Sequence, residues 1–82
     1  MFPKIKELKP MKDYKLYVVF DNGKSVVYDV KDDINSIKDF KPLETETGLF
    51  ENVQLDPSRT SVFWSDRIDL SSDTILEYGI SI

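Results

Sequence analysis

The amino-acid sequence predicts an α+β fold: a small, mainly antiparallel sheet of four to five strands, arranged as two hairpins, with a short C-terminal helix packed on it. Two observations predict this class. β-branched and aromatic residues dominate both sides of an Asn-Gly turn at residues 22–23, and residues 71–79 carry the signals of a short helix. The chain, residues 1–82, is expected to form a single domain.

The first hairpin has the clearest local signal. Segments Lys15–Phe20 and Lys24–Val30 flank Asn22-Gly23, which supplies the positive φ angles that a type I′ turn needs. A strand is expected before it at Lys4–Pro10. Because its apolar residues, Ile5 and Leu8, lie three positions apart, a bulge is expected between them.

The second half of the chain predicts another hairpin and the helix. Segments Asn52–Leu55 and Thr60–Trp64 are the expected strands, joined by an Asp-Pro turn. Ser71 is an expected N-cap for a helix over Ser72–Tyr78. Gly79 is expected to end that helix in a left-handed conformation.

The segment between the hairpins has weaker signals. Asp32 is expected to cap a short helical turn that places Ile34 and Ile37 on one face. Pro42 is expected at the first position of another turn. Trp64, the single tryptophan, is expected in the core, with an interface role as the alternative.

Composition excludes several kinds of chemistry. The 82 residues contain no Cys and no His, so disulfides, thiolate metal sites and imidazole catalysis are excluded. The three glycines lie far apart and form no phosphate-binding loop. We therefore expect a protein that is not an enzyme and that carries no cofactor and no metal.

The net charge of −4 is unevenly distributed. Residues 1–24 hold six lysines and three acidic residues, whereas residues 25–82 hold five basic and twelve acidic residues. An acidic body makes nucleic acid an unfavourable partner, and it suits either a small basic protein or solubility alone. With no leader and no membrane span evident, we expect a cytoplasmic protein, either a monomer or a weak homodimer.

One hairpin face and three groups of carboxylates are the candidate sites. Tyr17, Val19 and Val27 share the face opposite the core, where either a partner or a covering helix would bury them. Asp66, Asp69 and Asp73 would bind a cation or serve a carboxylate-based enzyme, or else shape the turn and the helix entry. The other two groups are Asp29, Asp32 and Asp33 and, further along, Glu44, Glu46 and Glu51. Each group is either an acidic patch that binds a partner or merely solvated surface.

The chain also resembles one small bacterial family, known as domain of unknown function 2442. The resemblance rests on the segments Leu16–Gly23, Tyr28–Val30, Phe40–Leu43 with Phe50, Val62–Trp64, Ile68–Leu70 and Ile75–Tyr78. The family usually has Gly where this chain has Arg67, in the segment before Ile68. The resemblance implies an α+β fold in a prokaryotic cytoplasmic protein, encoded beside another small protein in a layout similar to toxin–antitoxin pairs. It implies no catalytic residues.

These observations favour a non-catalytic protein-interaction module, antitoxin-like in binding a small basic protein encoded nearby. A homo-oligomeric structural module is the alternative. A DNA-associated regulator and a carboxylate-based enzyme are less favoured, because the charge and the missing side chains oppose them.

Overall fold

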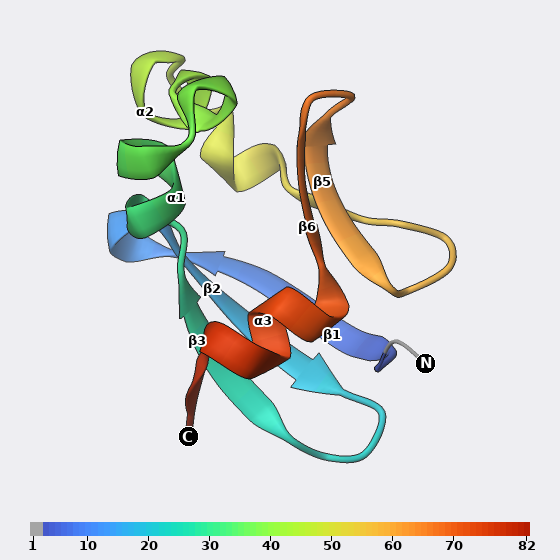
Figure 1. Cartoon of the computed structure of the whole chain (residues 1–82). Coiled ribbons are helices and arrows are strands. Elements are labelled where there is room, and N and C mark those ends of the chain that lie inside the picture. Colours follow the sequence, from blue (N-terminus) through green and yellow to red (C-terminus); the bar gives the residue numbers. More distant parts are fainter. Residues whose placement is uncertain (1–2) are drawn as a thin grey trace.

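The computed structural model describes residues 3–82, and its strands form two antiparallel sheets (Figure 1). The larger sheet has the order β1-β2-β3-β7 and the smaller has the order β4-β5-β6. The predicted α+β class is confirmed, and so are both predicted hairpins, β2–β3 and β4–β5. The turn of the first hairpin is not the predicted type I′, because Gly23 has a positive φ of 88° and Asn22 does not. The strands are β1 (Ile5–Met11), β2 (Lys15–Phe20), β3 (Ser25–Asp29), β4 (Gln54–Leu55), β5 (Ser61–Ser65), β6 (Ile68–Ser71) and β7 (Ile80–Ser81).

Strands β6 and β7 were not expected from the sequence, and neither was the division of the strands into two sheets, of which β6 extends the smaller and β7 the larger. β6 pairs with β5 after a turn at Asp66 and Arg67, and β7 pairs with β3 after the C-terminal helix. Arg67 forms its turn without a positive φ, and its backbone N–H donates to Ser65 Oγ at 3.4 Å. The glycine that the family usually has there is therefore not needed for this turn.

Short helices connect the strands. They are the 3₁₀ turn η1 (Lys12–Tyr14), α1 (Lys31–Ser36), η2 (Lys38–Phe40), α2 (Pro42–Thr45), η3 (Phe50–Asn52) and α3 (Ser72–Tyr78). Pro42 begins α2 and α3 has the predicted bounds. In Figure 1, α3 lies in front of the larger sheet, and α1 and α2 lie above it.

The core is one continuous cluster between the two sheets and the helices. Its pattern begins in β2, where Leu16, Val18 and Phe20 are buried and the residues between them are half-buried. This is the alternation that a strand with one face toward the core must show. A register shift between Ile5 and Glu7 confirms the predicted bulge, which keeps Ile5 buried at the start of β1.

Trp64 lies in the core and connects the smaller sheet to the helical segment. Its side chain is 8% exposed, and the indole Nε1–H donates to the Phe50 carbonyl oxygen at 2.9 Å. Its ring stacks on the Phe50 ring, with centroids 5.8 Å apart. The structure therefore places Trp64 where it stabilises the fold, rather than at an exposed interface.

Three local predictions for the helices were wrong. Asp32 is not the cap of α1, because Asp29 Oδ1 already accepts from the Lys31 backbone N–H at 3.0 Å at the start of that helix. Ile37 does not share a face with Ile34, because α1 ends at Ser36 and leaves Ile37 42% exposed.

The third concerns Gly79, which is extended rather than left-handed, with φ −73° and ψ 159°. A glycine is needed there for a different reason. A Cβ atom at this position would lie 2.5 Å from the Ile75 carbonyl oxygen and 3.1 Å from Val26 Cβ. Contact with the last turn of α3 itself, and to a lesser degree with Val26 of β3, therefore selects glycine, whereas a left-handed backbone does not.

Replacing Trp64 by phenylalanine should lower the free energy of unfolding by about 1–3 kcal/mol, because it removes the indole donor to the Phe50 carbonyl and opens a cavity. Urea unfolding followed by circular dichroism measures the change. The control is Tyr78→Phe at a side chain that is 71% exposed, which should shift the value by less than about 0.5 kcal/mol. Equal losses in the two variants would contradict the structural role of Trp64.

Replacing Gly79 by alanine should destabilise the protein by about 1–3 kcal/mol, since the new Cβ overlaps backbone that cannot move easily. Gly79→Asn should be at least as harmful. A left-handed residue would instead prefer asparagine to alanine. Thermal unfolding of the two variants separates the explanations, and a milder effect of asparagine would favour the left-handed conformation.

Candidate functional site

The predicted residues Tyr17, Val19 and Val27 lie together on the outer face, by which we mean the surface of the larger sheet turned away from the core. Strand register pairs Tyr17 with Val27, and Val27 with Ile80 of β7. Val19 lies one step along β2 on the same face. The three predicted side chains are half-buried, and Ile80 is 70% exposed. The sequence pattern missed Ile80, because only the pairing of β7 places it here.

Helix α3 does not cover the outer face. Val26 and Val27 are neighbours in β3 and therefore point to opposite faces of the sheet. The close approach of Gly79 is to Val26, which is 0% exposed, so that α3 packs on the core face. Ile75, in the middle of α3, is also 0% exposed. Of the two explanations for the apolar outer face, a covering C-terminal helix is therefore excluded.

Charges at the border of the outer face balance one another. In the strand register, Lys9 lies opposite Tyr17 and Glu7 lies opposite Val19 on the β1 side, and Lys15 lies opposite Asp29 at one end of the sheet. A shallow concavity of about 470 Å³ lies at the β1 side, lined by Glu7, Leu8, Lys9 and Tyr17. The outer face thus offers an apolar row with a polar border, an arrangement typical of protein interfaces.

The aspartates of the predicted cation site do not form one site. Asp66 and Asp69 line a concavity of about 300 Å³ together with Asp56, and Asp73 is not part of it. Asp73 lies in the first turn of α3, where its Oδ1 accepts from the Thr74 backbone N–H at 2.9 Å. Nowhere in residues 3–82 do three acidic side chains converge in a way that would hold a metal ion.

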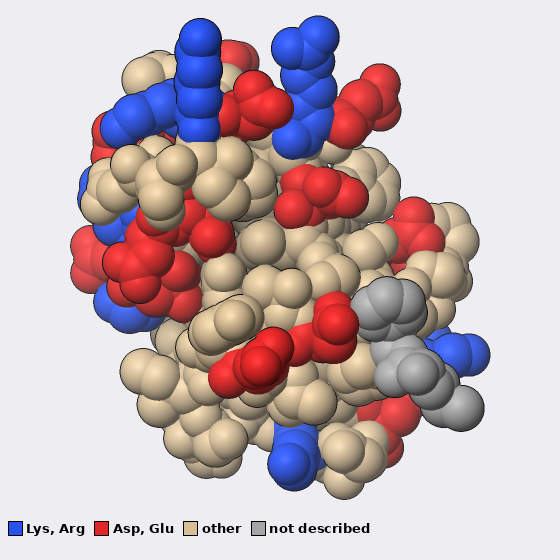
Figure 2. Space-filling view, in the orientation of Figure 1, with Lys and Arg blue, Asp and Glu red and all other residues tan. Residues whose placement is uncertain are grey.

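A second surface feature is the acidic groove, defined as the concavity of about 400 Å³ between residues 11–14 and residues 43–51. Leu43 and Phe50 are each 2% exposed and form its floor. Lys12 is the one basic residue in its lining. The carboxylates that line it are Asp13, Glu44, Glu46 and Glu51. Figure 2 shows acidic side chains gathered beside α1, at the left of the molecule, where the helix carries Asp32 and Asp33, which are not part of the groove lining.

One wall of the acidic groove depends on an unusual backbone conformation. Asp13 and Tyr14 are both left-handed, with φ values of 61° and 60°. This conformation costs a residue other than glycine about 1–2 kcal/mol. The Tyr14 ring contacts the Phe50 ring edge-to-face, with centroids 5.3 Å apart. Packing against the core therefore offsets the strain and fixes the Tyr14 side chain at the groove.

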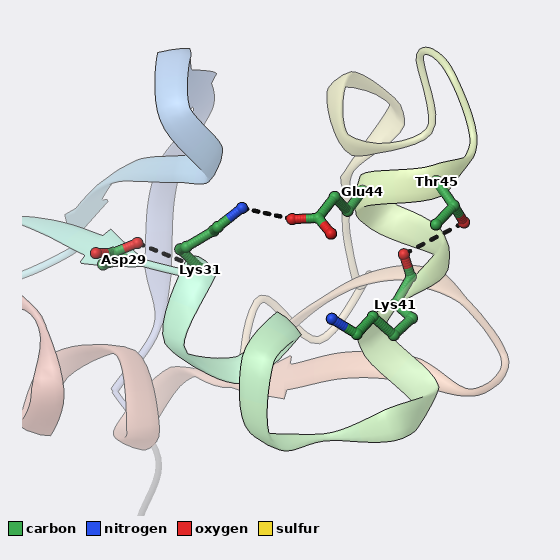
Figure 3. A network of polar contacts seen from close by, with 5 residues as sticks. All are labelled: Asp29, Lys31, Lys41, Glu44 and Thr45. Carbon is green, nitrogen blue, oxygen red and sulfur yellow. Dashed lines mark hydrogen bonds and ion pairs between the residues drawn. The ribbon is translucent and has the colours of Figure 1, made fainter.

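A lysine of the chain itself already occupies one end of this region. Lys31 Nζ forms an ion pair with Glu44 of α2, as Figure 3 shows. The same nitrogen lies 5.1 Å from the centroid of the Tyr14 ring. The hydrogen bond and the charge of Lys31 hold the pKa of the Glu44 carboxyl below its ordinary value. The same hydrogen bond raises the pKa of Lys31.

Tyr28 is the one buried side chain with an ionisable hydroxyl in the described part of the chain. It is 6% exposed, and its hydroxyl donates to Asp33 Oδ2 at 2.5 Å. Burial raises the pKa of the hydroxyl, and the neighbouring Asp33 raises it further. The phenol therefore stays protonated and cannot act as a base at neutral pH.

The sequence pattern of one protein family, described as "Protein of unknown function (DUF2442)", matches residues 5–81. The chain belongs to the DUF2442 family. The resemblance seen in the sequence is thereby confirmed, and the outer face and the acidic groove both lie within the DUF2442 match. No curated protein and no solved structure matches the chain. Within residues 3–82, no helix of this DUF2442 protein combines the length and the apolar character needed to cross a membrane.

Replacing Lys31 by methionine should raise the pKa of the Glu44 carboxyl, because the side-chain donor is lost. Carbon-detected NMR titration measures this pKa. Since the folded-state pKa is depressed, the stabilisation by the ion pair is present at neutral pH and is lost as the pH falls through that pKa. The matched control is Lys41→Met, because Lys41 acts on Glu44 by its charge alone and should shift the pKa less. Equal shifts in the two variants would contradict the ion pair.

Proposed function

We propose that this DUF2442 protein is a non-catalytic protein-interaction module that binds a partner protein through the outer face of its larger sheet. The observation that carries the proposal is the position of α3. It covers the core face at Val26 and leaves Tyr17, Val27 and Ile80 as an apolar row on the other face. A row of this kind supplies the apolar centre that a protein interface requires.

The chemistry of the described residues supports binding rather than turnover. The chain has neither His nor Cys, and the hydroxyl of Tyr28 is held protonated by burial and by Asp33. The carboxylates Asp66, Asp69 and Asp73 are not gathered at one concavity.

The partner that we propose is a small basic protein, encoded beside this one in an antitoxin-like arrangement. The charges at the border of the outer face cancel one another. The proposed basic character of the partner therefore complements the acidic remainder of the chain and not the outer face itself. Residues 25–82 hold twelve acidic and five basic side chains. Such an imbalance accelerates association with a basic protein and makes the association dependent on salt.

The test is co-expression with the product of the adjacent gene, followed by purification of the complex and titration by calorimetry. Tyr17→Ser should weaken binding by about thirtyfold, which corresponds to about 2 kcal/mol for an aromatic at the centre of an interface. The matched control is Phe63→Ser, because Phe63 is a half-buried aromatic on the face of the smaller sheet that is turned away from the core. It should leave the affinity unchanged, after both variants are shown to be folded.

Two results would contradict the proposal. One is the absence of a complex at micromolar concentrations of both proteins. The other is equal weakening by Tyr17→Ser and Phe63→Ser. Sedimentation of the protein alone adds an independent outcome, because a tight homodimer that Tyr17→Ser dissociates would show that a second copy of the chain, not another protein, covers the outer face.

A further inference from the structure

We infer that the free edge of β7 accepts an extended, basic segment of the partner protein as an additional strand of the larger sheet. The inference rests on the proposed function, since it names the chemistry by which the same partner is recognised. The edge adds backbone hydrogen bonds to the apolar contact of the outer face, because Ile80 belongs both to β7 and to the apolar row.

The backbone of β7 has unused hydrogen-bonding groups at the edge of the sheet. Ile82 N–H donates to the Ser25 carbonyl oxygen at 3.1 Å, and Ile80 pairs with Val27. Because successive residues of a strand direct their backbone groups to opposite sides, the N–H and C=O of Ser81 point away from β3. Ser81 is exposed, and β7 is the last strand in the order of its sheet. An extended segment supplies the donor and the acceptor that complement this edge.

The opposite edge of the larger sheet is closed to such a segment. Ile5 N–H of β1 donates to the Arg59 carbonyl oxygen at 2.7 Å, so the beginning of that edge is already paired. Pro10, further along β1, has no N–H to donate. Lys6 and Lys9 of β1 are exposed, and charged residues of this kind oppose pairing with another chain. β7 has none of these protections, so strand addition to the larger sheet is directed to it.

Exposed apolar side chains flank the free backbone groups of β7. Tyr78, Ile80 and Ile82 are each at least 70% exposed, and they are three of the five large apolar side chains that are exposed in residues 3–82. Apolar surface is therefore concentrated at this edge. Ile80 and Ile82 lie two positions apart in an extended segment and point to the same side. An added strand would place its own apolar side chains beside them and bury both.

Charge complementarity selects a basic segment and not a second copy of the chain. Helix α3 carries Asp73 and Glu77 and no basic residue, and Figure 2 shows acidic side chains over it. Tyr78 lines a concavity of about 300 Å³ together with Asp29, Asp32 and Asp33. Lys24 precedes Ser25 at the far end of the edge, so the attraction is strongest near Tyr78. Pairing between two copies of β7 would bring two acidic helices together, whereas lysine or arginine side chains would be attracted.

The experiment titrates a defined probe, a seven-residue peptide in which lysine and valine alternate, into the ¹⁵N-labelled full chain. The Ser81 amide proton should exchange rapidly with solvent in the free chain and become protected when the peptide binds. Ser81→Pro removes the N–H that faces the edge and no hydrogen bond within the sheet, so it should weaken binding at least tenfold. The matched control, Ser81→Ala, keeps this N–H and should leave the affinity within twofold. The amide of Ile82, which is bonded to Ser25, reports in both variants that β7 is formed.

Three results would overturn the inference. They are an unprotected Ser81 amide at millimolar peptide, equal affinities of the two Ser81 variants, and equally tight binding of a peptide with glutamate in place of lysine. Protection of the Ser81 amide that rises with protein concentration in the absence of peptide would show instead that a second copy pairs with β7.

The complex with the partner protein separates this inference from the proposed function. If Tyr17→Ser weakens the complex and Ser81→Pro does not, the edge is not used and the interaction through the outer face stands. If Ser81→Pro weakens the complex and Tyr17→Ser does not, the edge is supported and the outer face is contradicted.

Discussion

Burial of one face of the larger sheet is the constraint on which the rest of the structure depends. Leu16, Val18 and Phe20 of β2 alternate with half-buried residues and are almost fully buried. A chain of 82 residues has little material with which to cover them, and it uses both the smaller sheet and α3 for this purpose. Because Gly79 lets the end of α3 approach Val26 closely, the helix packs on the core face and does not cover the outer face.

That constraint explains why apolar residues remain on the opposite face. Tyr17 and Val27 pair across β2 and β3, and the pairing stabilises the sheet whether or not a partner is present. Ile80 pairs with Val27 in the same way, but it is 70% exposed at the edge of the sheet. This exposed extension of the apolar row is the feature on which the proposed interaction depends.

Much of the fold could be predicted from local signals, and what was missed depends on distant residues. The Asn22-Gly23 turn fixes the β2–β3 hairpin within fifteen residues of sequence, and the cap signals before α3 give its bounds. β7 has two residues and forms only because α3 returns the chain to β3. The extended conformation of Gly79 was mispredicted for a related reason, because the chain continues there into β7.

The two candidate surfaces, the outer face and the acidic groove, also differ in whether local sequence signals predict them. The outer face follows from the two-residue period of a strand, so Tyr17, Val19 and Val27 could be placed together from the sequence.

The groove could not be predicted, because its walls are about thirty residues apart in the chain and no periodic pattern connects them. The carboxylates of its second wall were visible as an acidic group, but the first wall has no sequence signal. It is formed by the left-handed backbone at Asp13 and Tyr14, and neither position is a glycine that would reveal such a conformation. The Tyr14 ring is held there by Phe50, a core residue that in turn accepts the hydrogen bond of Trp64. A surface that depends on the core in this way is held in shape by the packing of Phe50 against Tyr14 and Trp64.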